Sequence, residues 1–484
     1  MCYLAVMLWC VWWSVLAGGT WPQDDPARKP KDSGYRGIWF TLGQYSAAPE
    51  LREDPAKYWE YGDKYSGGLG TYTADHVPIA IYAPQVQKTF FCYGGAKEGK
   101  QYLYNMVSYY DHQHDRVPRP TILHDKHGVN DPHDNASLTI DHQGHLWVYV
   151  SGRGRSRPGY VYRSVEPYDI DRFIQVSADE ICYPQPWAVE GDGILELFTK
   201  YTGGRELYWN VRAFDGTRGE DRKLAGIAGH YQVSCQSGHR IVTAFNRHPG
   251  GTPDTRTDLY YLETRDLGAT WQTADGTTIT PPLVAPQNPA LVKAYSDVQR
   301  LVYINSIALD RAGNPAILLV ASSSHRPGPD GDPRNWEVLH YRDGTWRTRF
   351  VTRSTHNYDM GPLWIESDGT WRIAGPTEPG PQRWGTGGEI ALWISHDEGI
   401  SWAKVRDVTR GSPRNHTYVR NVIGAEPDSP CAMLWADGHT DKLSVSCIYF
   451  ANREGTVVRR LPYDMEGEFA VPATVTFPPL PPAP

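Results

Sequence analysis

Seven short polar clusters recur along this chain, and each leads directly into an apolar or alternating segment typical of a strand. One anchor residue from each cluster lies at His76, His133, Tyr183, His230, Asn305, His356 and His416. The intervals between successive anchors are 57, 50, 47, 75, 51 and 60 residues. A repeat of this length in a strand-rich chain predicts a propeller, in which each repeat forms one blade.

We therefore predict an all-β fold, a seven-bladed β-propeller of four-stranded antiparallel blades over residues 34–470. The composition agrees, because 18 Trp, 30 Tyr, 47 Gly and 38 Pro among 484 residues suit short strands joined by tight turns. The innermost strands of a propeller converge on one axis. Polar residues at the same end of these strands would then ring a central pocket, where we expect the chemistry.

The two ends of the chain differ from the repeating part. An apolar run from Tyr3 to Leu16 ends in small residues at Ala17, which predicts a secretory signal peptide over 1–17 and a secreted or periplasmic protein. A buried N-terminal segment is the alternative reading. The run is too short to predict a membrane span. Residues 18–33 read as a linker, and residues 471–484 as a Pro-rich tail.

Charge and cysteine content limit the classes of ligand. The formal net charge of −7 gives no basic stripe for nucleic acid. No CxxC pair or Cys/His cluster predicts a zinc site, and we expect no required cofactor. A structural calcium ion on the axis is compatible with the fold. We also expect a monomer. Cys431 and Cys447 lie at equal distances from the turn-like residue His439. An antiparallel hairpin centred there would form a disulfide, and two buried thiols are the alternative.

Two segments share the spacing Asp-x-Gly-x-x-Trp. They are Asp266 to Trp271 and Asp397 to Trp402. This spacing is that of the Asp-box, or BNR, turn between two outer strands of a propeller blade. The Asp caps the turn, the Gly takes an unusual dihedral and the Trp buries the turn. We predict a structural role for both segments.

Asp-box propellers include the sialidases, but the Arg-Ile-Pro motif of that class is absent from this chain. Sialidase activity therefore stays a minor alternative. Longer segments resemble seven-bladed BNR-repeat enzymes that act on rhamnose–glucuronate linkages: α-L-rhamnosidases, L-rhamnose-α-1,4-D-glucuronate lyases and, more distantly, ulvan lyases. The segments that carry this resemblance are Tyr65–His76, His133–Ser137, Gly229–Val233, His356–Gly361, Pro376–Gln382 with Gly387–Glu389, and Asn415–Arg420 with Trp435–Gly438.

The resemblance implies a polysaccharide or oligosaccharide substrate and, for a lyase, a pair of proton-transfer residues. The His of the His-Asp-Asn motif and the Tyr of the next blade match His133 and Tyr183 here. A lyase also needs a cation to neutralise the uronate carboxylate. Lys200 stands where the lyase pattern has an arginine, and Arg153 stands where it often has a second histidine. These two departures leave the reaction open.

Hydrolysis is the competing expectation. In the rhamnosidase branch a single histidine of the first blade is catalytic, and the matching residue is His76. A third alternative is a non-catalytic propeller that only binds glycans. We expect the remaining polar residues of the clusters to bind substrate around the pocket, together with Lys200 and Arg153: His230, Tyr231, His356, Tyr358, His416 and Arg420.

Overall fold

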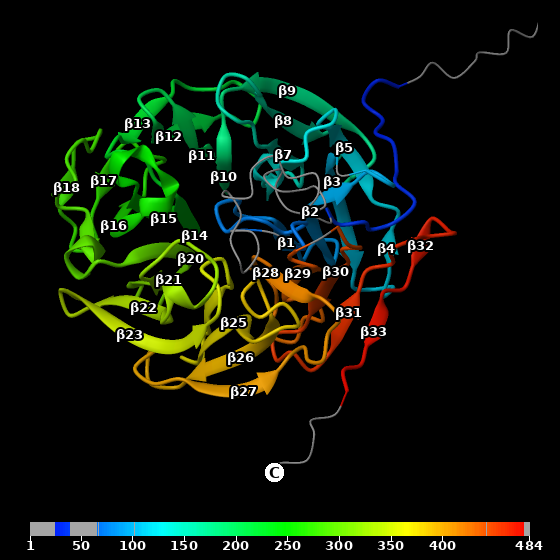
Figure 1. Ribbon diagram of the computed structural model, residues 1–484. Coiled ribbons are helices and arrows are strands. Elements are labelled where there is room, and N and C mark those ends of the chain that lie inside the picture. Colours follow the sequence, from blue (N-terminus) through cyan, green and yellow to red (C-terminus); the bar gives the residue numbers. More distant parts are fainter. Residues whose placement is uncertain (1–24, 39–64, 66, 101, 442, 479–484) are drawn as a thin grey trace, which may run out of the picture.

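The computed structural model describes residues 25–38, 65, 67–100, 102–441 and 443–478, which form seven antiparallel sheets around a central axis (Figure 1). In each sheet the strand that comes first in sequence lies nearest the axis, because the first strands of successive blades contact one another: β1 with β6, β6 with β10, β10 with β14, β14 with β20, and β20 with β24. The predicted seven-bladed propeller is therefore confirmed.

The first three blades each contain four strands. Blade 1 consists of β1 (Ala80–Ala83), β2 (Lys88–Ala96), β3 (Leu103–Asp111) and β5 (Thr121–Asp125). Blade 2 consists of β6 (Ala136–Ile140), β7 (Leu146–Val150), β8 (Gly159–Ser164) and β9 (Phe173–Asp179). Blade 3 consists of β10 (Cys182–Val189), β11 (Gly193–Tyr201), β12 (Arg205–Arg212) and β13 (Arg222–Ala225).

Among the remaining four blades, blades 5 and 6 have four strands, whereas blades 4 and 7 have more. Blade 4 consists of β14 (Gln232–Ser237), β15 (Arg240–Arg247), β16 (Thr257–Thr264), β17 (Trp271–Gln272) and β18 (Thr278–Ile279), with β19 (Leu291–Lys293) also paired to β16. Blade 5 consists of β20 (Leu301–Leu309), β21 (Pro315–Ser322), β22 (Arg334–Arg342) and β23 (Thr345–Ser354). Blade 6 consists of β24 (Leu363–Ile365), β25 (Trp371–Glu378), β26 (Glu389–Ser395) and β27 (Ala403–Asp407). Blade 7 consists of β28 (Asn415–Asn421), β29 (Met433–Gly438), β30 (Ile448–Ala451), β31 (Val458–Arg460) and β33 (Ala473–Val475).

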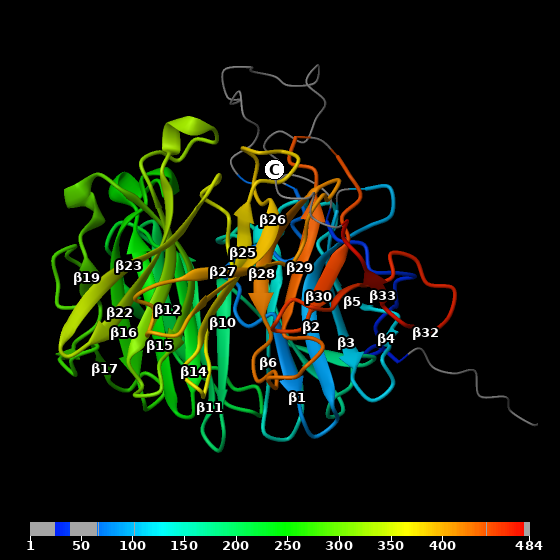
Figure 2. The ribbon, with the colours of Figure 1, turned by 90° about the horizontal axis from the view of Figure 1, so that it is seen from below.

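Burial falls from the inner strands of a blade to its edge. Every residue of β21 is buried, whereas β27 at the edge of the next blade is exposed at four of its five residues. An inner strand is covered on both faces by the neighbouring blades, so it carries apolar residues almost continuously instead of alternating. The blades are thus held by face-to-face packing, and the connecting loops gather on the two ends of the barrel-like body (Figure 2).

All seven polar clusters lie shortly before an innermost strand or within its first five residues. Three of these strands, β10, β20 and β28, carry a register shift at the cluster. Tyr183 and Tyr418 stand at two of the shifts with φ of 50° and 53°. A bulge of this kind turns a side chain away from the regular alternation of the strand.

Both Asp-boxes form the predicted turns between the third and fourth strands of their blades. In blade 4, the Asp266 carboxylate accepts hydrogen bonds from the Thr270 N–H (2.8 Å) and hydroxyl (2.6 Å), and Gly268 has a φ of 81°. Asp397 repeats these contacts with Ser401 in blade 6. These turns lie at the end opposite the polar clusters, because an antiparallel blade places its first and third turns at the same end.

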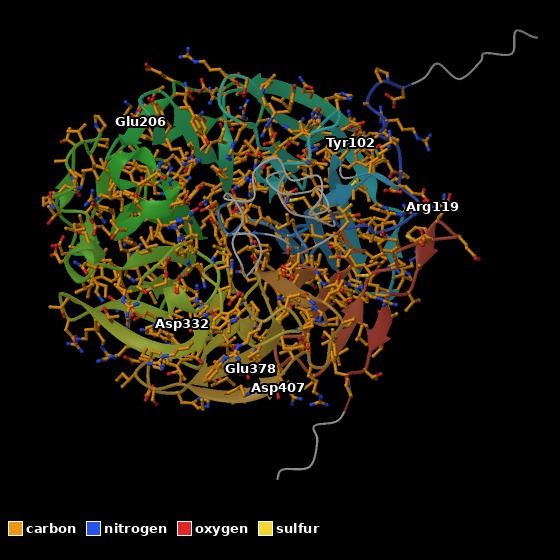
Figure 3. The ribbon with its side chains drawn as sticks, viewed as in Figure 1. Tyr102, Arg119, Glu206, Asp332, Glu378 and Asp407 are labelled. Atoms are coloured by element: carbon orange, nitrogen blue, oxygen red, sulfur yellow. The ribbon has the colours of Figure 1, made fainter. Side chains whose placement is uncertain are left out.

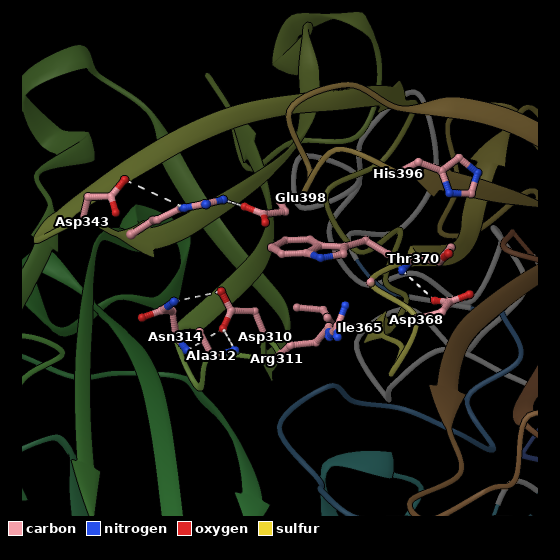
Figure 4. Close-up of a pocket in the computed structure, with 13 residues that line it drawn as sticks. Asp310, Arg311, Ala312, Asn314, Asp343, Ile365, Asp368, Thr370, His396 and Glu398 are labelled. Carbon is pink, nitrogen blue, oxygen red and sulfur yellow. Dashed lines mark hydrogen bonds and ion pairs between the residues drawn. The ribbon is translucent and has the colours of Figure 1, made fainter.

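A pocket of about 800 Å³ lies at that same opposite end, between blades 5 and 6 (Figure 4). Hairpin turns supply its lining, and several of its charged side chains pair with one another or cap those turns. Arg342 forms an ion pair with Glu398, and the Asp368 carboxylate accepts the Thr370 N–H at 2.8 Å. These contacts stabilise the turns around the pocket, so they give these charged residues a structural role.

The chain before blade 1 lies across the junction between the first and last blades. The predicted signal peptide over 1–17 lies outside the described residues, but residues 25–33 of the predicted linker form bridges to blades 1 and 2. The Gly37 N–H then donates to the Ser446 carbonyl in blade 7 (3.1 Å), while Gly37 bridges Gly95 in blade 1. The described part of the chain contains no helix with the length and apolar character that a membrane crossing requires.

The C-terminal segment joins the same two blades from outside. Strand β33 adds to blade 7, so the predicted Pro-rich tail over 471–484 begins with a paired strand. Strand β32 (Phe469–Ala470) pairs with β4 (Val117–Pro118) beside blade 1. The Arg119 guanidinium, labelled in Figure 3, donates to the carbonyls of Met465 (3.1 Å), Glu466 (2.8 Å) and Gly467 (3.0 Å). We call residues 461–475 the C-terminal strap.

Cys431 and Cys447 are both free, so the disulfide considered from the sequence does not form. The reason is register. Strand β29 pairs Met433 with Ala451, which centres the hairpin on residue 442 and not on His439. The two thiols are consequently not opposite each other, and burial raises the pKa of Cys431 to about 12.

The strap predicts a stability effect for Arg119→Ala. Loss of the hydrogen bonds from one guanidinium to three carbonyls should lower the free energy of unfolding by about 1–3 kcal/mol. Urea denaturation followed by tryptophan fluorescence measures it. Arg347→Ala is the control, because this residue lies on the edge strand β23 and pairs only with exposed Asp343. Equal midpoints for the two variants would contradict a closing role for the strap.

Candidate functional site

A buried cluster of tyrosines and arginines lies at the end of the propeller where the innermost strands begin. Tyrosine rings, three guanidinium groups and the His133 imidazole contact one another around the axis. We call it the arginine–tyrosine cluster. Its members are Tyr72, His133, Arg153, Tyr183, Tyr201, Arg205, Tyr231, Arg256, Tyr303 and Tyr358.

His133 is fixed by the short 3-10 helix η3 (Pro132–Asp134) that precedes β6. The Asp131 carboxylate caps this helix by accepting the His133 N–H (3.1 Å), and it also binds Nδ1 of the same imidazole (2.7 Å). A carboxylate only accepts, so Nδ1 carries the proton. Nε2 is then the basic nitrogen, and the Tyr72 hydroxyl donates to it at 2.9 Å.

The electrostatic surroundings keep this imidazole neutral. Burial lowers the pKa of His133 to about 4, because it outweighs the opposing effect of Asp131, and the charges of Arg153 and Arg205 act in the same direction as burial. The carboxylate of Asp131 stays ionised beside its cationic neighbours; Arg157 donates to it at 2.7 Å. Nε2 of His133 is therefore unprotonated near neutral pH, with the Tyr72 hydroxyl as its hydrogen-bond partner.

The other two residues of the His-Asp-Asn motif have structural contacts. Asp134 is fully buried between Arg157 (2.9 Å) and Lys126 (3.0 Å). The Asn135 amide donates to the Tyr72 carbonyl at 2.8 Å. The motif thus holds the loop that carries Tyr72 and positions the histidine, which alone faces the cluster.

Tyr183 lies beside His133, with ring centroids 5.8 Å apart in an edge-to-face arrangement. The bulge at the start of β10 directs it there. Arg153 donates to its hydroxyl at 2.5 Å. Burial raises the pKa of Tyr183 well above its usual value, and the Arg153 charge opposes that shift. Arg153 therefore stabilises the phenolate form of Tyr183.

Three arginines of the cluster come from equivalent connections of three consecutive blades. Arg153 and Arg256 stand between the second and third strands of blades 2 and 4, and Arg205 is the first residue of the third strand of blade 3. Arg205 lies over Tyr231 (5.5 Å) and donates to the Tyr201 hydroxyl at 3.3 Å. Arg256 lies over Tyr303 (4.2 Å) and Tyr231 (4.6 Å). Within the described residues, neither Arg205 nor Arg256 forms an ion pair with a carboxylate.

Of the predicted substrate-binding residues, Tyr231, Tyr358 and Arg153 belong to the cluster. Tyr358 accepts a hydrogen bond from Arg256 at 2.9 Å. His230 and His356 lie at its edge: the His230 imidazole contacts the Thr199 hydroxyl (3.2 Å), and Nδ1 of His356 accepts the Tyr358 N–H (3.2 Å). Burial lowers the pKa of both imidazoles.

His76 has both ring nitrogens engaged in backbone contacts. Nδ1 accepts the Thr73 N–H (3.3 Å), so Nε2 carries the proton and donates to the His133 carbonyl at 2.9 Å. The residue is fully buried, and burial lowers its pKa to about 3. In this conformation His76 supports the loop of His133 and presents no basic nitrogen to a ligand.

Three other predicted residues lie away from the cluster or bind other groups. Lys200 pairs with Asp221 at 2.9 Å. His416 contacts Ser412 (2.9 Å) and accepts from the Trp435 indole (3.0 Å). Arg420 binds the backbone carbonyls of Thr71, Thr73 and His76, so it braces the loop before β1.

Sequence reasoning missed Tyr72, Asp131, Tyr201, Arg205, Tyr303 and Arg256. The available signal was the spacing of the arginines, since Arg153, Arg205 and Arg256 are separated by 52 and 51 residues, close to the blade repeat. For metals, no group of three or more His, Cys, Asp or Glu side chains suited to hold an ion occurs among the described residues.

The depressed pKa of His230 predicts a pH-dependent contribution to stability. The unfolded imidazole binds a proton below its ordinary pKa of 6.5, whereas the folded one does so only near 3. Folding is therefore opposed as the pH falls from 6.5, by about 1.4 kcal/mol per pH unit at most. Denaturation of wild type and His230→Gln from pH 7 to pH 4 should show the wild type losing more stability.

His396→Gln supplies the control for that comparison, because His396 is exposed on the opposite face. Its pH profile should match that of the wild type. Identical slopes for His230→Gln and the wild type would contradict the pKa assignment.

Comparisons with solved structures place the fold among known propellers. An ulvan lyase of polysaccharide lyase family PL25, bound to -[GlcA(1-4)Rha3S]-, superposes with a TM-score of 0.64 at 15% identity, covering 88% of this chain and 96% of that one. The polysaccharide lyase Uly1 gives a TM-score of 0.61 at 12% identity, over 87% and 99% of the two chains. At these identities the likeness concerns the fold.

No curated protein matches the chain in sequence. A family model, that of BNR repeat-containing family members, matches residues 96–354, which is 259 of the 484 residues. The matched region runs from the end of β2 to the end of β23 and includes His133, Tyr183 and all three arginines of the cluster. The chain belongs to the BNR repeat-containing family.

Proposed function

We propose that this protein is a carbohydrate-active enzyme, a lyase that cleaves a uronate-containing polysaccharide at a rhamnose–glucuronate type linkage by β-elimination. The observation that carries the proposal is the juxtaposition of His133 and Tyr183 with Arg205, which forms no ion pair with a carboxylate in the described part of the chain. The shared fold with ulvan lyases agrees with it.

Elimination needs three groups, and the cluster contains a candidate for each. A cation must neutralise the uronate carboxylate, which makes the C5 proton more acidic. Arg205 is suited to this role because it is partly exposed and its guanidinium has only a tyrosine hydroxyl as hydrogen-bond partner in the described structure. Arginine also offers a bidentate fork for a carboxylate, which Lys200 would lack.

His133 and Tyr183 then transfer the protons. Nε2 of His133 takes the C5 proton, the C5–H electrons form the C4–C5 double bond, and the bond from C4 to the leaving oxygen breaks. Tyr183 gives its proton to that oxygen and becomes a phenolate, which the Arg153 guanidinium at 2.5 Å stabilises. In this proposal Arg153 acts on the tyrosine and not as a substitute for the missing histidine.

The geometry of His76 favours elimination over hydrolysis. The unprotonated nitrogen of His76 accepts a fixed backbone N–H, whereas that of His133 accepts only the Tyr72 hydroxyl, whose hydrogen can rotate away. The cluster also lacks the pair of carboxylates that most glycosidases use. The two reactions give different products, since only elimination leaves an unsaturated uronate that absorbs ultraviolet light.

Incubation with ulvan, gum arabic or arabinogalactan should thus increase ultraviolet absorbance. His133→Ala and Tyr183→Phe should each lower kcat by about 10²–10⁴-fold, since proton transfer contributes this much. Binding of the polymer should persist in both variants. New reducing ends without absorbance would support hydrolysis instead. Binding without either signal would support a glycan-binding propeller.

Arg205 and Lys200 give a matched test of carboxylate recognition. Arg205→Ala should lower kcat/KM by about 10²-fold or more, because removing one charge-stabilising donor costs this much in comparable sites. Lys200→Ala should change it less than about threefold, since Lys200 pairs with Asp221 outside the cluster. The reverse order of effects would assign the carboxylate to Lys200.

A further inference from the structure

A second cavity, of about 290 Å³, opens between blades 5 and 6 at the same end of the propeller as the arginine–tyrosine cluster. It is lined by the loop before β22, the end of β23 and the loop between β25 and β26. Asp332, which Figure 3 labels, stands on its rim. No role in the proposed reaction uses this cavity.

The cavity is cationic, although the whole chain has a net charge of −7. Arg334, Arg353 and Arg383 line it against a single carboxylate, Asp332, which leaves a charge of +2. Arg353 and Arg383 are exposed, and neither forms an ion pair with a carboxylate within the described structure. Two cations at the mouth of a cavity favour an anionic ligand.

The aromatic component is Trp384, which is partly exposed in the cavity wall. Arg383 lies over its ring at 5.1 Å and Arg334 at 6.0 Å. An indole presents a flat apolar face to the C–H groups of a sugar ring, while adjacent guanidinium groups bind a charged substituent of the same sugar. The combination of Trp384 with arginines therefore suits an acidic saccharide.

Arg334 supplies an independent indication that a ligand belongs here. Its side chain is fully buried, donates to Asp332 (2.7 Å) and to the Arg326 carbonyl (2.8 Å), and lines the cavity. Its Nε has no hydrogen-bond partner among the described residues. A buried charge with an unsatisfied donor is costly, and an anion bound in the cavity that Arg334 lines would offset part of that cost.

The position of the cavity continues the pattern of the candidate site. Arg383 stands between the second and third strands of blade 6, and Arg334 is the first residue of the third strand of blade 5, so both lie at the connection that carries Arg153, Arg205 and Arg256 in blades 2 to 4. Five consecutive blades thus each place an arginine at one end of the propeller. We call this series the arginine arc.

We propose that the cavity at Trp384 is a second subsite, beside the arginine–tyrosine cluster, that binds an anionic sugar residue of the polysaccharide through a sulfate or a carboxylate group. This inference rests on the proposed function for the identity of the polymer. The arginine arc places one arginine of each of blades 2 to 6 at this end of the propeller, so the enzyme would recognise a chain that carries charge on more than one sugar.

The larger pocket at the opposite end is unsuited to the same ligand. Its lining contains more carboxylates than arginines and is therefore negative. The carboxylates belong to Asp310, Asp343, Asp368 and Glu398, and the arginines are Arg311 and Arg342. Its tryptophan, Trp371, is buried. Arg311 therefore offers a matched arginine on the wrong face for a control variant.

The test measures binding and not turnover, so it stands apart from the lyase proposal. Dissociation constants for ulvan and for chemically desulfated ulvan are measured by calorimetry and by affinity electrophoresis, in the full chain carrying His133→Ala to prevent cleavage. Neutral dextran is the polymer control. The variants are Arg353→Ala with Arg383→Ala, Trp384→Ala, Trp384→Phe and Arg311→Ala.

We expect Trp384→Ala and the double arginine variant to weaken ulvan binding by about tenfold or more, as for the loss of charge-assisted hydrogen bonds or of a stacking face. Trp384→Phe and Arg311→Ala should stay within about threefold. If desulfation removes the effect of the arginine variant, the subsite binds sulfate. If the effect persists, it binds the uronate carboxylate.

Unchanged dissociation constants for both polymers would overturn the subsite, as would a wild-type chain that binds neither. The two proposals fail separately. Arginine-dependent binding without ultraviolet absorbance refutes the lyase reaction and keeps the subsite. Lyase activity that does not change when Trp384 or both arginines are replaced refutes the subsite and keeps the lyase reaction.

Discussion

The stacking of seven sheets around one axis is the constraint on which the rest of the structure depends. Each blade begins at the axis and ends at the rim, and the chain then returns to the axis to start the next blade. Every innermost strand therefore begins at the same end of the molecule. The turns between second and third strands reach that end too. Residues far apart in sequence, such as Tyr72, Tyr183 and Arg256, consequently meet in one cluster.

A ring of blades needs contacts that join its first and last blades. In the described part of this propeller, no blade combines strands from both ends of the chain. The segment around Gly37 runs between blades 1 and 7, and the C-terminal strap binds blade 1 through β32 and Arg119. Parallel contact between Ile81 and Ile423 closes the ring near the axis. Because the site is built across blades 1 to 6, its geometry depends on this closure as much as on local contacts.

Much of this arrangement could be predicted from the sequence, and the rest depends on side-chain direction. The period of the polar clusters predicts the blades because it reports a backbone repeat. It does not report which face of a strand a residue occupies. Thr199 and Tyr201 face the site, so Lys200 between them points the other way, to Asp221.

His416 follows the same rule. Asn415 and Thr417 bind inward, to the Gln382 and Gly68 carbonyls, while His416 contacts Trp435 on the other side of β28. Tyr183 points toward the cluster because a bulge interrupts the regular alternation of β10, and this bulge has no clear sequence signature. The Cys431–Cys447 pairing failed for a related reason, since a shift of the hairpin centre by three residues separates the two side chains.

Buried arginines without carboxylate partners are costly, so their environment requires an explanation. Aromatic rings and hydroxyls surround Arg205 and Arg256, which offsets part of the desolvation cost, and the charge of Asp75 also acts on Arg256. Arg420 shows the contrasting case. Three backbone carbonyls surround its guanidinium, and burial lowers its pKa to about 10, so it serves as a brace. The charge that remains available lies on the face where the substrate would bind.

This arrangement also links substrate binding to the basicity of His133. The charges of Arg153 and Arg205 help to hold the pKa of His133 near 4. Under the proposed function, a uronate carboxylate bound to Arg205 would neutralise part of that positive field, and the pKa of His133 would rise. The imidazole would then become a stronger base only when the carboxylate that acidifies the C5 proton is in place. The charge that recognises the substrate would thereby also restrict proton abstraction to acidic sugars.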